Sequence, residues 1–271
     1  MVPGLVVSVI VPTRNSQSTL GACLASIRRQ TYPQVELIVV DRDSTDGTPA
    51  LARRYTRQVY NHGPERSAQR NFGVGRASGA YVCVIDADME LAPEVLAEAV
   101  AALQANEQAR GVIIPEESFG EGFWARCKAL ERSFYNGFEP VEAARFMSRQ
   151  DYLSLGGFDS NLVAGEDWDL SQRLKATGPL VRTRAVIRHN EQRLSLVATL
   201  RKKYYYAHSA RAYLAKHPQT ALAAPAGPLQ RYKLFLSKPG KLFRNPVVGL
   251  GVLFMKTAEF AAGAIGYFAP R

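Results

Sequence analysis

The stretch YVCVIDAD, residues 81–88, places two carboxylates directly after an apolar run. The first five of these residues are apolar and rich in β-branched side chains, which is typical of a strand buried on both faces. Asp86 and Asp88 follow where such a strand ends. Carboxylate oxygens are ligands that Mg²⁺ and similar cations prefer, and a bound cation can stabilise a diphosphate. The stretch therefore predicts a ligand site at the edge of a sheet.

Three more apolar runs of this kind alternate with segments in which apolar residues recur at helical spacing. The runs occupy residues 6–11, 35–40 and 111–114. The helical segments are residues 18–30, 49–55 and 93–105. This alternation is typical of βαβ units and predicts an α/β fold with a mostly parallel sheet flanked by helices. Polar residues gather after the runs, at the strand ends where open α/β sheets bind ligands.

The chain changes character near residue 115. Residues 116–145 are predicted to form a loop-and-helix lid, with one helix over 123–134, rather than more sheet. A helix over 170–176 and a strand over 181–188 that ends at His189 follow, and helical structure is expected from residue 194. The first predicted domain is therefore residues 1–193, in halves of about 1–115 and 116–193, followed by a C-terminal region, residues 194–271.

The net charge of +10 is concentrated in the C-terminal region. Residues 200–271 contain 12 Lys and Arg against one acidic residue, whereas residues 1–199 contain 22 against 23. A local excess of this kind indicates an anionic partner. Because Lys and Arg alternate with Tyr, Phe and Leu, an anionic membrane surface is favoured. Nucleic acid is not expected, since no nucleic-acid-binding module is recognisable.

Two apolar runs near the C-terminus, residues 247–255 and 260–269, are separated by Lys256 and Glu259. Each run is shorter than the roughly 18–20 residues that crossing a bilayer requires, and the charges between them are costly in hydrocarbon. Two alternatives stay open. The segment lies on the membrane, or it packs against the catalytic domain or a second subunit in a homo-oligomer.

The cysteines and the start of the chain bear on the compartment. Cys23, Cys83 and Cys127 are odd in number and far apart, so we expect reduced core residues rather than a disulfide framework. No cleavable apolar segment precedes the first strand, which argues against secretion. With the basic C-terminal region, these features predict a cytoplasmic protein that is peripheral at the inner face of the cell membrane.

Four motifs, in order, resemble those of glycosyltransferase family 2. They are Val11-Pro12-Thr13-Arg14-Asn15, Val39-Val40-Asp41 with Ser44-Thr45-Asp46-Gly47-Thr48, Asp86-Ala87-Asp88, and Glu166-Asp167 with Arg173-Leu174. One Asp-x-Asp is a weak signal, whereas four ordered motifs over residues 6–190 are specific. The resemblance implies the Rossmann-like GT-A fold. It also implies an inverting enzyme that transfers a sugar from a nucleotide-sugar.

On the metal side, the resemblance implies that Asp88 binds Mn²⁺ or Mg²⁺ directly and that Asp86 lies near the ribose and metal-bound water. His189 is expected to complete the metal shell, because neutral imidazole is a good ligand for Mn²⁺ beside carboxylates. The cation would neutralise the charge that develops on the departing nucleoside diphosphate.

On the nucleotide side, the resemblance implies contacts with base, ribose and diphosphate. The residues expected to make them are Pro12, Thr13, Asn15, Asp41 and Arg70. Arg42 and Ser16 stand where the family usually has Asp and Glu, so the base is less well defined by the motif than usual. Uridine is the expected nucleoside of the donor.

On the acceptor side, Asp167 is expected to be the general base that takes the proton of the acceptor, with Glu166 as the second candidate. The acceptor is expected to be a hydroxyl or phosphate of a lipid-linked or envelope glycan. Two other functions fit parts of the pattern. A sugar nucleotidyltransferase would carry a Gly-rich phosphate loop after the first strand, which residues 12–16 do not form. A non-catalytic membrane-associated scaffold is disfavoured by the intact Asp86, Asp88 and Asp167.

Overall fold

The computed structural model describes residues 5–216 and 227–269. Residues 217–226 and 270–271 of the predicted C-terminal region lie outside the described residues. The chain forms two compact units. The first unit consists of Met1–Pro115, Ala143–Ser160 and Glu166–His189, and the second of Glu116–Glu142, Asn161–Gly165 and Asn190–Arg271. One boundary between the units lies at residue 115, and residues 143–160 and 166–189 belong to the first unit. The domains at residues 1–193 and 194–271 stay a prediction.

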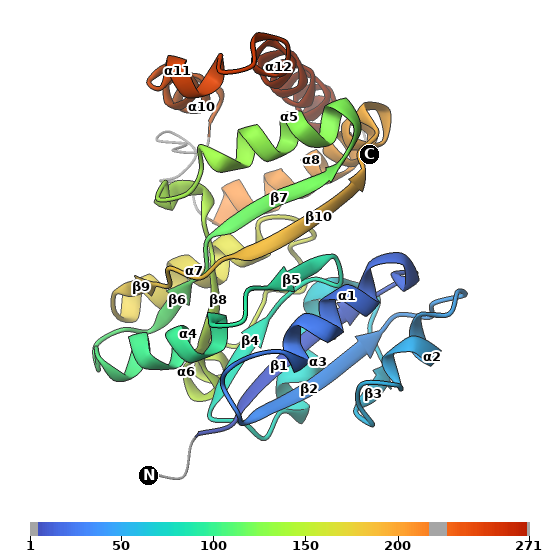
Figure 1. Cartoon of the computed structure of the whole chain (residues 1–271), viewed down its shortest axis with the longest axis vertical. Coiled ribbons are helices and arrows are strands. Elements are labelled where there is room, and N and C mark those ends of the chain that lie inside the picture. The colour runs from blue at the N-terminus through green and yellow to red at the C-terminus, as the bar shows by residue number, and fades with distance from the viewer. Residues whose placement is uncertain (1–4, 217–226, 270–271) are drawn as a thin grey trace. The chain divides into compact units, whose positions relative to one another are not determined.

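The first unit is built on a seven-stranded sheet, coloured from blue to yellow in Figure 1. The strand order is β3 (Val59–Asn61), β2 (Val35–Asp41), β1 (Val7–Thr13), β4 (Tyr81–Val84), β8 (Ala144–Ser148), β6 (Gly111–Ile113) and β9 (Leu180–Arg182). Only β8 is antiparallel to its neighbours among the pairings described. The predicted mostly parallel α/β sheet is therefore confirmed.

Helices cover both faces of this sheet (Figure 1). They are α1 (Gln17–Arg28), α2 (Thr48–Ala52), α3 (Arg66–Arg76), α4 (Val95–Gln104), α6 (Arg149–Ser154) and α7 (Glu166–Thr177). Successive strand residues point to opposite faces: Val9 and Val11 pack with α1 and α4, whereas Ile10 packs with α3, α6 and α7. Burial on both faces explains why the strands read as continuous apolar runs.

The interpretation of residues 116–145 as a lid without sheet is wrong. Two strands lie there, β7 (Glu116–Glu121) and the start of β8. Strand β7 is mostly polar because it belongs to a separate three-stranded sheet, in the order β5 (Met89–Leu91), β10 (Ile187–Arg193) and β7. Strand β8 is buried on both faces but contains Arg145, which interrupts its apolar pattern.

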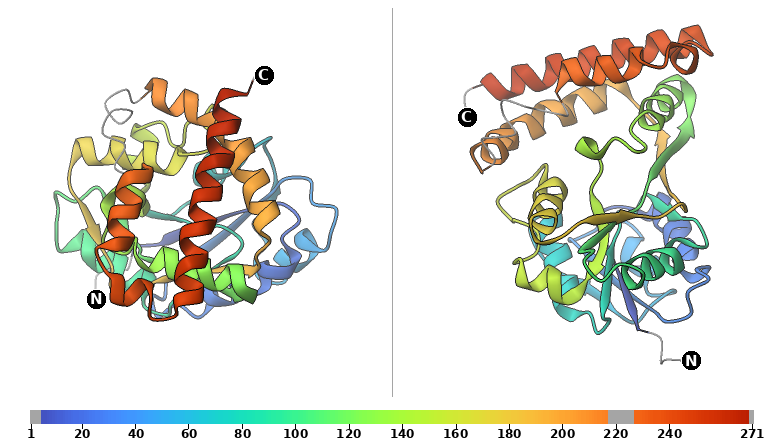
Figure 2. Two further views of the ribbon diagram at one scale, coloured as in Figure 1. Left: turned by 90° about the horizontal axis from the view of Figure 1, so that it is seen from above. Right: turned by 90° about the vertical axis from the view of Figure 1, so that its left-hand side faces the viewer.

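The remaining elements of the second unit are helical. They are α5 (Gly122–Ser133), η1 (Glu139–Val141), α8 (Leu196–Lys216), α10 (Pro228–Leu236), α11 (Pro239–Leu242) and α12 (Pro246–Phe268). Helix α12 packs on α8 and α5, and both views of Figure 2 show it lying beside them. Buried apolar side chains of α5, α10 and α12, including Cys127, Phe235 and Met255, form the core of this unit. The prediction of a helical C-terminal region is confirmed.

The two predicted C-terminal apolar runs form one helix. Asn245 caps α12 by accepting a hydrogen bond from the Val248 N–H, and Pro246 occupies the first turn, where its missing N–H costs nothing. By length and composition α12 is the one described helix that could cross a membrane, with 39% of its most apolar window buried against protein. Treating the runs as separate, short segments was therefore wrong. The charges between them are buried, as described below.

Candidate active site

The metal-binding candidates meet where β4 ends. Asp86 and Asp88 lie in the turn between β4 and β5, and β10 pairs with β5 so that His189 lies opposite Met89. This pairing brings the His189 Nε2 to 3.3 Å from the Asp88 Oδ2. The structure thus places together two of the predicted residues that are about a hundred positions apart in the sequence.

The donor atoms at this edge suit a hard divalent cation. The Oδ1 atom of Asp88 is buried and has no hydrogen-bond partner among the described residues, although the side chain as a whole is partly exposed. A buried carboxylate oxygen left in this way is costly unless a ligand satisfies it. No group of three or more His, Cys, Asp or Glu is arranged for a metal in the described part of the chain. A cation here would draw further ligands from diphosphate and water, as Mg²⁺ commonly does.

Asp86 forms an ion pair with a buried arginine of the protein, Arg70. The Arg70 guanidinium, buried on α3, donates to Asp86 Oδ1 at 2.6 Å. Burial alone would favour the neutral acid, but Arg70, with Arg145 and Arg66, holds the pKa of Asp86 well below its usual range. Arg70 therefore largely balances the charge of Asp86, whereas Asp88 forms no ion pair with Lys or Arg among the described residues.

Arg70 also reaches the acceptor-side acids. Its second terminal nitrogen donates to Glu166 Oε1 at 2.9 Å, and Arg66 lies 3.6 Å from the same oxygen. Both Arg70 and Glu166 are buried. One guanidinium thus joins the turn after β4 to the first turn of α7, through the two-pronged geometry that Arg provides. Arg70 was predicted near the diphosphate, and its observed contacts are with these two carboxylates.

Glu166 and Asp167 occupy different environments at the start of α7. Burial and the neighbouring Asp167 raise the pKa of Glu166, although Arg70 and Arg66 oppose this. Asp167 is half-buried, and its Oδ1 accepts a hydrogen bond from the Trp168 N–H at 2.9 Å. Because Glu166 is held by Arg70, Asp167 is the less constrained of the two acids.

The predicted nucleotide loops are joined to each other by side chains. Asp41, at the end of β2, accepts hydrogen bonds from the Thr13 hydroxyl at 2.7 Å and from the Ser44 N–H at 2.8 Å. Asn15 adopts a left-handed conformation with φ of 48°, which Asn tolerates better than most residues. Its Oδ1 accepts from the Thr45 N–H at 2.9 Å. Pro12 is buried at the end of β1. The loops after β1 and β2 therefore form one connected rim.

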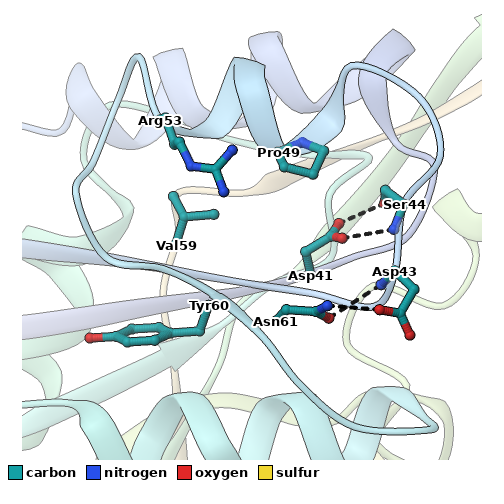
Figure 3. Close-up of a pocket in the computed structure, with 8 residues that line it drawn as sticks. All are labelled: Asp41, Asp43, Ser44, Pro49, Arg53, Val59, Tyr60 and Asn61. Atoms are coloured by element: carbon teal, nitrogen blue, oxygen red, sulfur yellow. Dashed lines mark hydrogen bonds between the residues drawn. The ribbon is translucent and has the colours of Figure 1, made fainter.

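A pocket of about 350 Å³ lies beside this rim (Figure 3). Its lining residues are Asp41, Asp43, Ser44, Pro49, Arg53, Val59, Tyr60 and Asn61. Figure 3 shows the Asp41 carboxylate turned toward Ser44, and Asn61 paired with Asp43. Arg42 points elsewhere: it donates to the Pro64 carbonyl and lies 3.3 Å from Glu65. The residue that departs from the family motif is thus used to fasten a neighbouring loop.

The comparison with known proteins agrees with this arrangement. A family described as "Glycosyl transferase family 2" matches residues 8–153, more than half of the chain. The chain belongs to glycosyltransferase family 2. The matched part includes β1, β2, the Asp-x-Asp turn and Arg70, and stops before α7.

Named relatives of this family 2 protein are similar over parts of their length. Glycosyltransferase AglE of Haloferax volcanii is 27% identical over 194 residues, 64% of this chain and 62% of AglE. The GalNAc(5)-diNAcBac-PP-undecaprenol beta-1,3-glucosyltransferase of Campylobacter jejuni is 35% identical over 94 residues, 31% of this chain and 30% of that enzyme. The chain spans less than two thirds of the length of the curated relatives it matches first.

A solved structure shares the fold. The mannosyltransferase PcManGT from Pyrobaculum calidifontis, in complex with GDP-Man and Mn²⁺, has a TM-score of 0.64 and 21% identity, over 98% of this chain and 88% of that one. The GT-A fold expected for a family 2 glycosyltransferase is confirmed.

Two residues that support the site were not singled out in the sequence. The Gln69 side-chain amide is buried and donates to the carbonyls of Thr13 and Val40 at 2.9 and 2.6 Å, which fixes the ends of β1 and β2. Arg145 adds positive potential at Asp86. Arg145 could have been noticed as a cation inside an otherwise apolar run, since such a residue needs an anion when buried. Gln69 gave no comparable signal.

Proposed function

We propose that this protein is an inverting glycosyltransferase that uses Mn²⁺ or Mg²⁺ and a nucleotide-sugar donor. The observation that carries the proposal is the pair of acids after β4. Arg70 balances the charge of Asp86, and Asp88 keeps a buried oxygen without a hydrogen-bond partner among the described residues. Asp88 and His189 would hold the cation, which would supply electrostatic stabilisation of the departing diphosphate.

In the proposed reaction the acceptor hydroxyl oxygen forms a bond to the anomeric carbon, and the bond from that carbon to the diphosphate oxygen breaks. The leaving diphosphate retains the electron pair, and the acceptor proton passes to the Asp167 carboxylate. Glu166 has the second role. Its contact with Arg70 supports a positioning function, because the carboxylate oxygen that would take a proton is already occupied by two arginines.

We further propose a UDP-linked donor and a lipid-linked or envelope-glycan acceptor at the cytoplasmic membrane surface. The name of the Campylobacter relative describes a transferase acting on an undecaprenol-diphosphate glycan, which supports the acceptor class. The basic C-terminal region supports a membrane location, because residues 200–271 contain 12 Lys and Arg and one acidic residue. The complex of PcManGT contains GDP-Man, so a GDP-linked sugar is the alternative to a UDP-linked donor.

The test is a panel of UDP- and GDP-sugars incubated with the protein and Mn²⁺, with release of nucleoside diphosphate as the readout. We expect slow metal-dependent hydrolysis of a UDP-sugar, and transfer when a polyprenyl-linked acceptor is added. Asp167→Asn should lose transfer to a hydroxyl acceptor while still binding the donor. Metal-independent turnover, or full transfer by Asp167→Asn, would refute the assignment. Release of pyrophosphate from a nucleoside triphosphate and a sugar phosphate would instead identify a nucleotidyltransferase.

A further inference from the structure

Helix α12 has its charged residues inside and its apolar residues outside. Lys256 and Glu259 are the charged residues of this helix, and both are buried. On the opposite side, five large apolar side chains at spacings of three, four, eleven and three residues share one helix face and are between 59% and 78% exposed. They are Val247, Leu250, Phe254, Ile265 and Phe268, called here the outer stripe. This is the reverse of the usual surface helix, which turns its apolar face inward.

An ion-pair cluster with α5 fixes this orientation. Lys256 lies 2.5 Å from both Glu131 and Glu259, and Lys128 lies 3.0 Å from Glu131 and 3.3 Å from Glu259. Both glutamates contact both lysines, and Arg231 and Lys203 add longer contacts of 4.0 Å to Glu131 and Glu259. The position is buried, and an unpaired charge there would be strongly unfavourable. Because the cluster holds one side of α12 against α5, the outer stripe must face away from the core of the unit.

The surface around the outer stripe is apolar and basic. Leu229 and Leu236 of α10 are 82% and 55% exposed, and Lys238 and Arg244 beside α11 are also exposed. Figure 2 shows α10, α11 and α12 next to one another. Glu259 is the single acidic residue of residues 200–271, and it is buried. The described helices within residues 200–271 therefore present cations and apolar groups with no accessible carboxylate.

This combination selects one occupant. A second copy would bring an equally basic surface against this one, which like-charge repulsion disfavours. A membrane-spanning α12 would have to separate Lys256 and Glu259 from α5 or carry the whole cluster into hydrocarbon. An anionic lipid surface matches both properties, since its headgroups attract Lys and Arg and its acyl boundary accepts apolar side chains.

We propose that α12 lies in the plane of an anionic lipid bilayer with its outer stripe in the acyl boundary. The exposed cations beside α11, Lys238 and Arg244, would then lie at the headgroups. This inference rests on the membrane location proposed above and is independent of the transfer chemistry. At 1.5 Å per residue the helix would cover roughly 34 Å of the surface. The proposal unites the two alternatives left open by the sequence, because one side of α12 packs on protein and the other faces lipid.

The experiment uses the full chain and co-sedimentation with two vesicle types, phosphatidylcholine alone and phosphatidylcholine with phosphatidylglycerol. We expect wild type to bind the anionic vesicles and to bind the neutral vesicles weakly. The double variant Leu250→Gln/Phe254→Gln should reduce binding by about tenfold or more, because both side chains lose their apolar contact. Leu153→Gln, at an exposed apolar position of α6 in the other unit, is the matched control and should bind like wild type.

Unchanged binding by the double variant, or an equal loss in Leu153→Gln, would overturn the proposal. A wild-type dimer in light scattering that Phe254→Gln converts to a monomer would assign the stripe to a second copy instead, and resistance to alkaline carbonate extraction would indicate a span. Thermal unfolding checks that the variants fold. The double variant should still hydrolyse the donor, whereas Asp88→Asn should lose hydrolysis and keep vesicle binding, so that the two proposals fail separately.

Discussion

The two units place charge in opposite ways. In the first unit, Arg70 joins Asp86 and Glu166 at the end of the sheet, and Asp88 is left there with no Lys or Arg ion pair among the described residues. In the second unit, Glu131 and Glu259 are each paired with Lys128 and Lys256 inside a helical core, and Arg231 and Lys203 lie 4.0 Å from Glu131 and Glu259, respectively. The difference teaches how to distinguish buried charges: a carboxylate oxygen without a partner leaves a site that a ligand can satisfy, whereas carboxylates that are all paired with cations fix the packing of the fold.

The largest expected effect is on the ion-pair cluster. Glu131→Gln leaves Lys128 and Lys256 partly uncompensated in the core, so the free energy of unfolding should fall by about 3–5 kcal/mol. Urea denaturation monitored by circular dichroism measures this. Glu117→Gln, on the exposed side of β7, should change little. Replacing all four cluster residues with Met and Leu should restore most of the stability; if the quadruple variant is as unstable as Glu131→Gln, the cluster is more than an orientation device.

A substitution at Asp88 should lower the activity of the protein and leave its stability nearly unchanged. Asp88→Asn removes the charge that would bind the cation, so sugar transfer should fall by about a hundredfold or more, while the unfolding free energy stays near that of wild type. Steady-state kinetics at saturating Mn²⁺, with the same variant melted thermally, separates the two effects. Glu90→Gln, the next acid along the chain, serves as the control. A large loss of stability with normal turnover would contradict the metal assignment.

Arg70→Lys tests whether the two hydrogen bonds from the Arg70 guanidinium to Asp86 and Glu166 are needed in addition to its positive charge. Lysine keeps the cation but cannot donate in the planar, two-pronged way that links Asp86 and Glu166. We expect about a tenfold loss in kcat with little change in the Mn²⁺ concentration needed for half-maximal rate. Arg76→Lys, exposed on the same helix, should behave like wild type. A changed metal requirement would show that Arg70 acts on the cation site directly.

Lowering the pH should destabilise the second unit before the first unit. Despite burial, the lysines lower the pKa of Glu131 and of Glu259, so their contribution to stability is present above the ordinary glutamate pKa and is lost as pH falls below it. In the first unit Asp86 behaves in the same way, but the pKa of Glu166 is raised, so its contribution has the opposite sign: present at low pH and lost as pH rises. Hydrogen exchange followed from about pH 5 to 2, below the ordinary glutamate pKa, should show earlier opening in α5 and α12 than in β1 and β4. Simultaneous opening would contradict this difference.

The sequence predicted the sheet well and the contacts poorly, for physical reasons. Buried parallel strands are continuous apolar runs, so β1, β2, β4 and β6 were recognisable. The site at their carboxyl ends stays a prediction. Strand β8 was missed because Arg145 breaks its pattern. The contact of Asp88 with His189 depends on the β5–β10 pairing, which no local pattern encodes.

Helix α12 gave the opposite difficulty. A hydropathy pattern counts Lys256 and Glu259 as interruptions, and it divided one helix into two runs. Their burial is explained only by Lys128 and Glu131, which lie on α5 more than a hundred residues earlier. Which face of α12 is outside follows from those partners, so the outer stripe could not be inferred before the structure was known.

The ion-pair cluster also sets an order of events during synthesis. Lys128 and Glu259 are 131 residues apart, so the ribosome needs roughly 7–26 s after making one to make the other, at about 5–20 residues per second. During that interval Lys128 and Glu131 of α5 have been made, but their partners on α12 have not. The last segment of the first unit, which ends at His189, is made within the same interval. The nascent chain can therefore close its sheet early, and its helical unit closes only when α12 emerges.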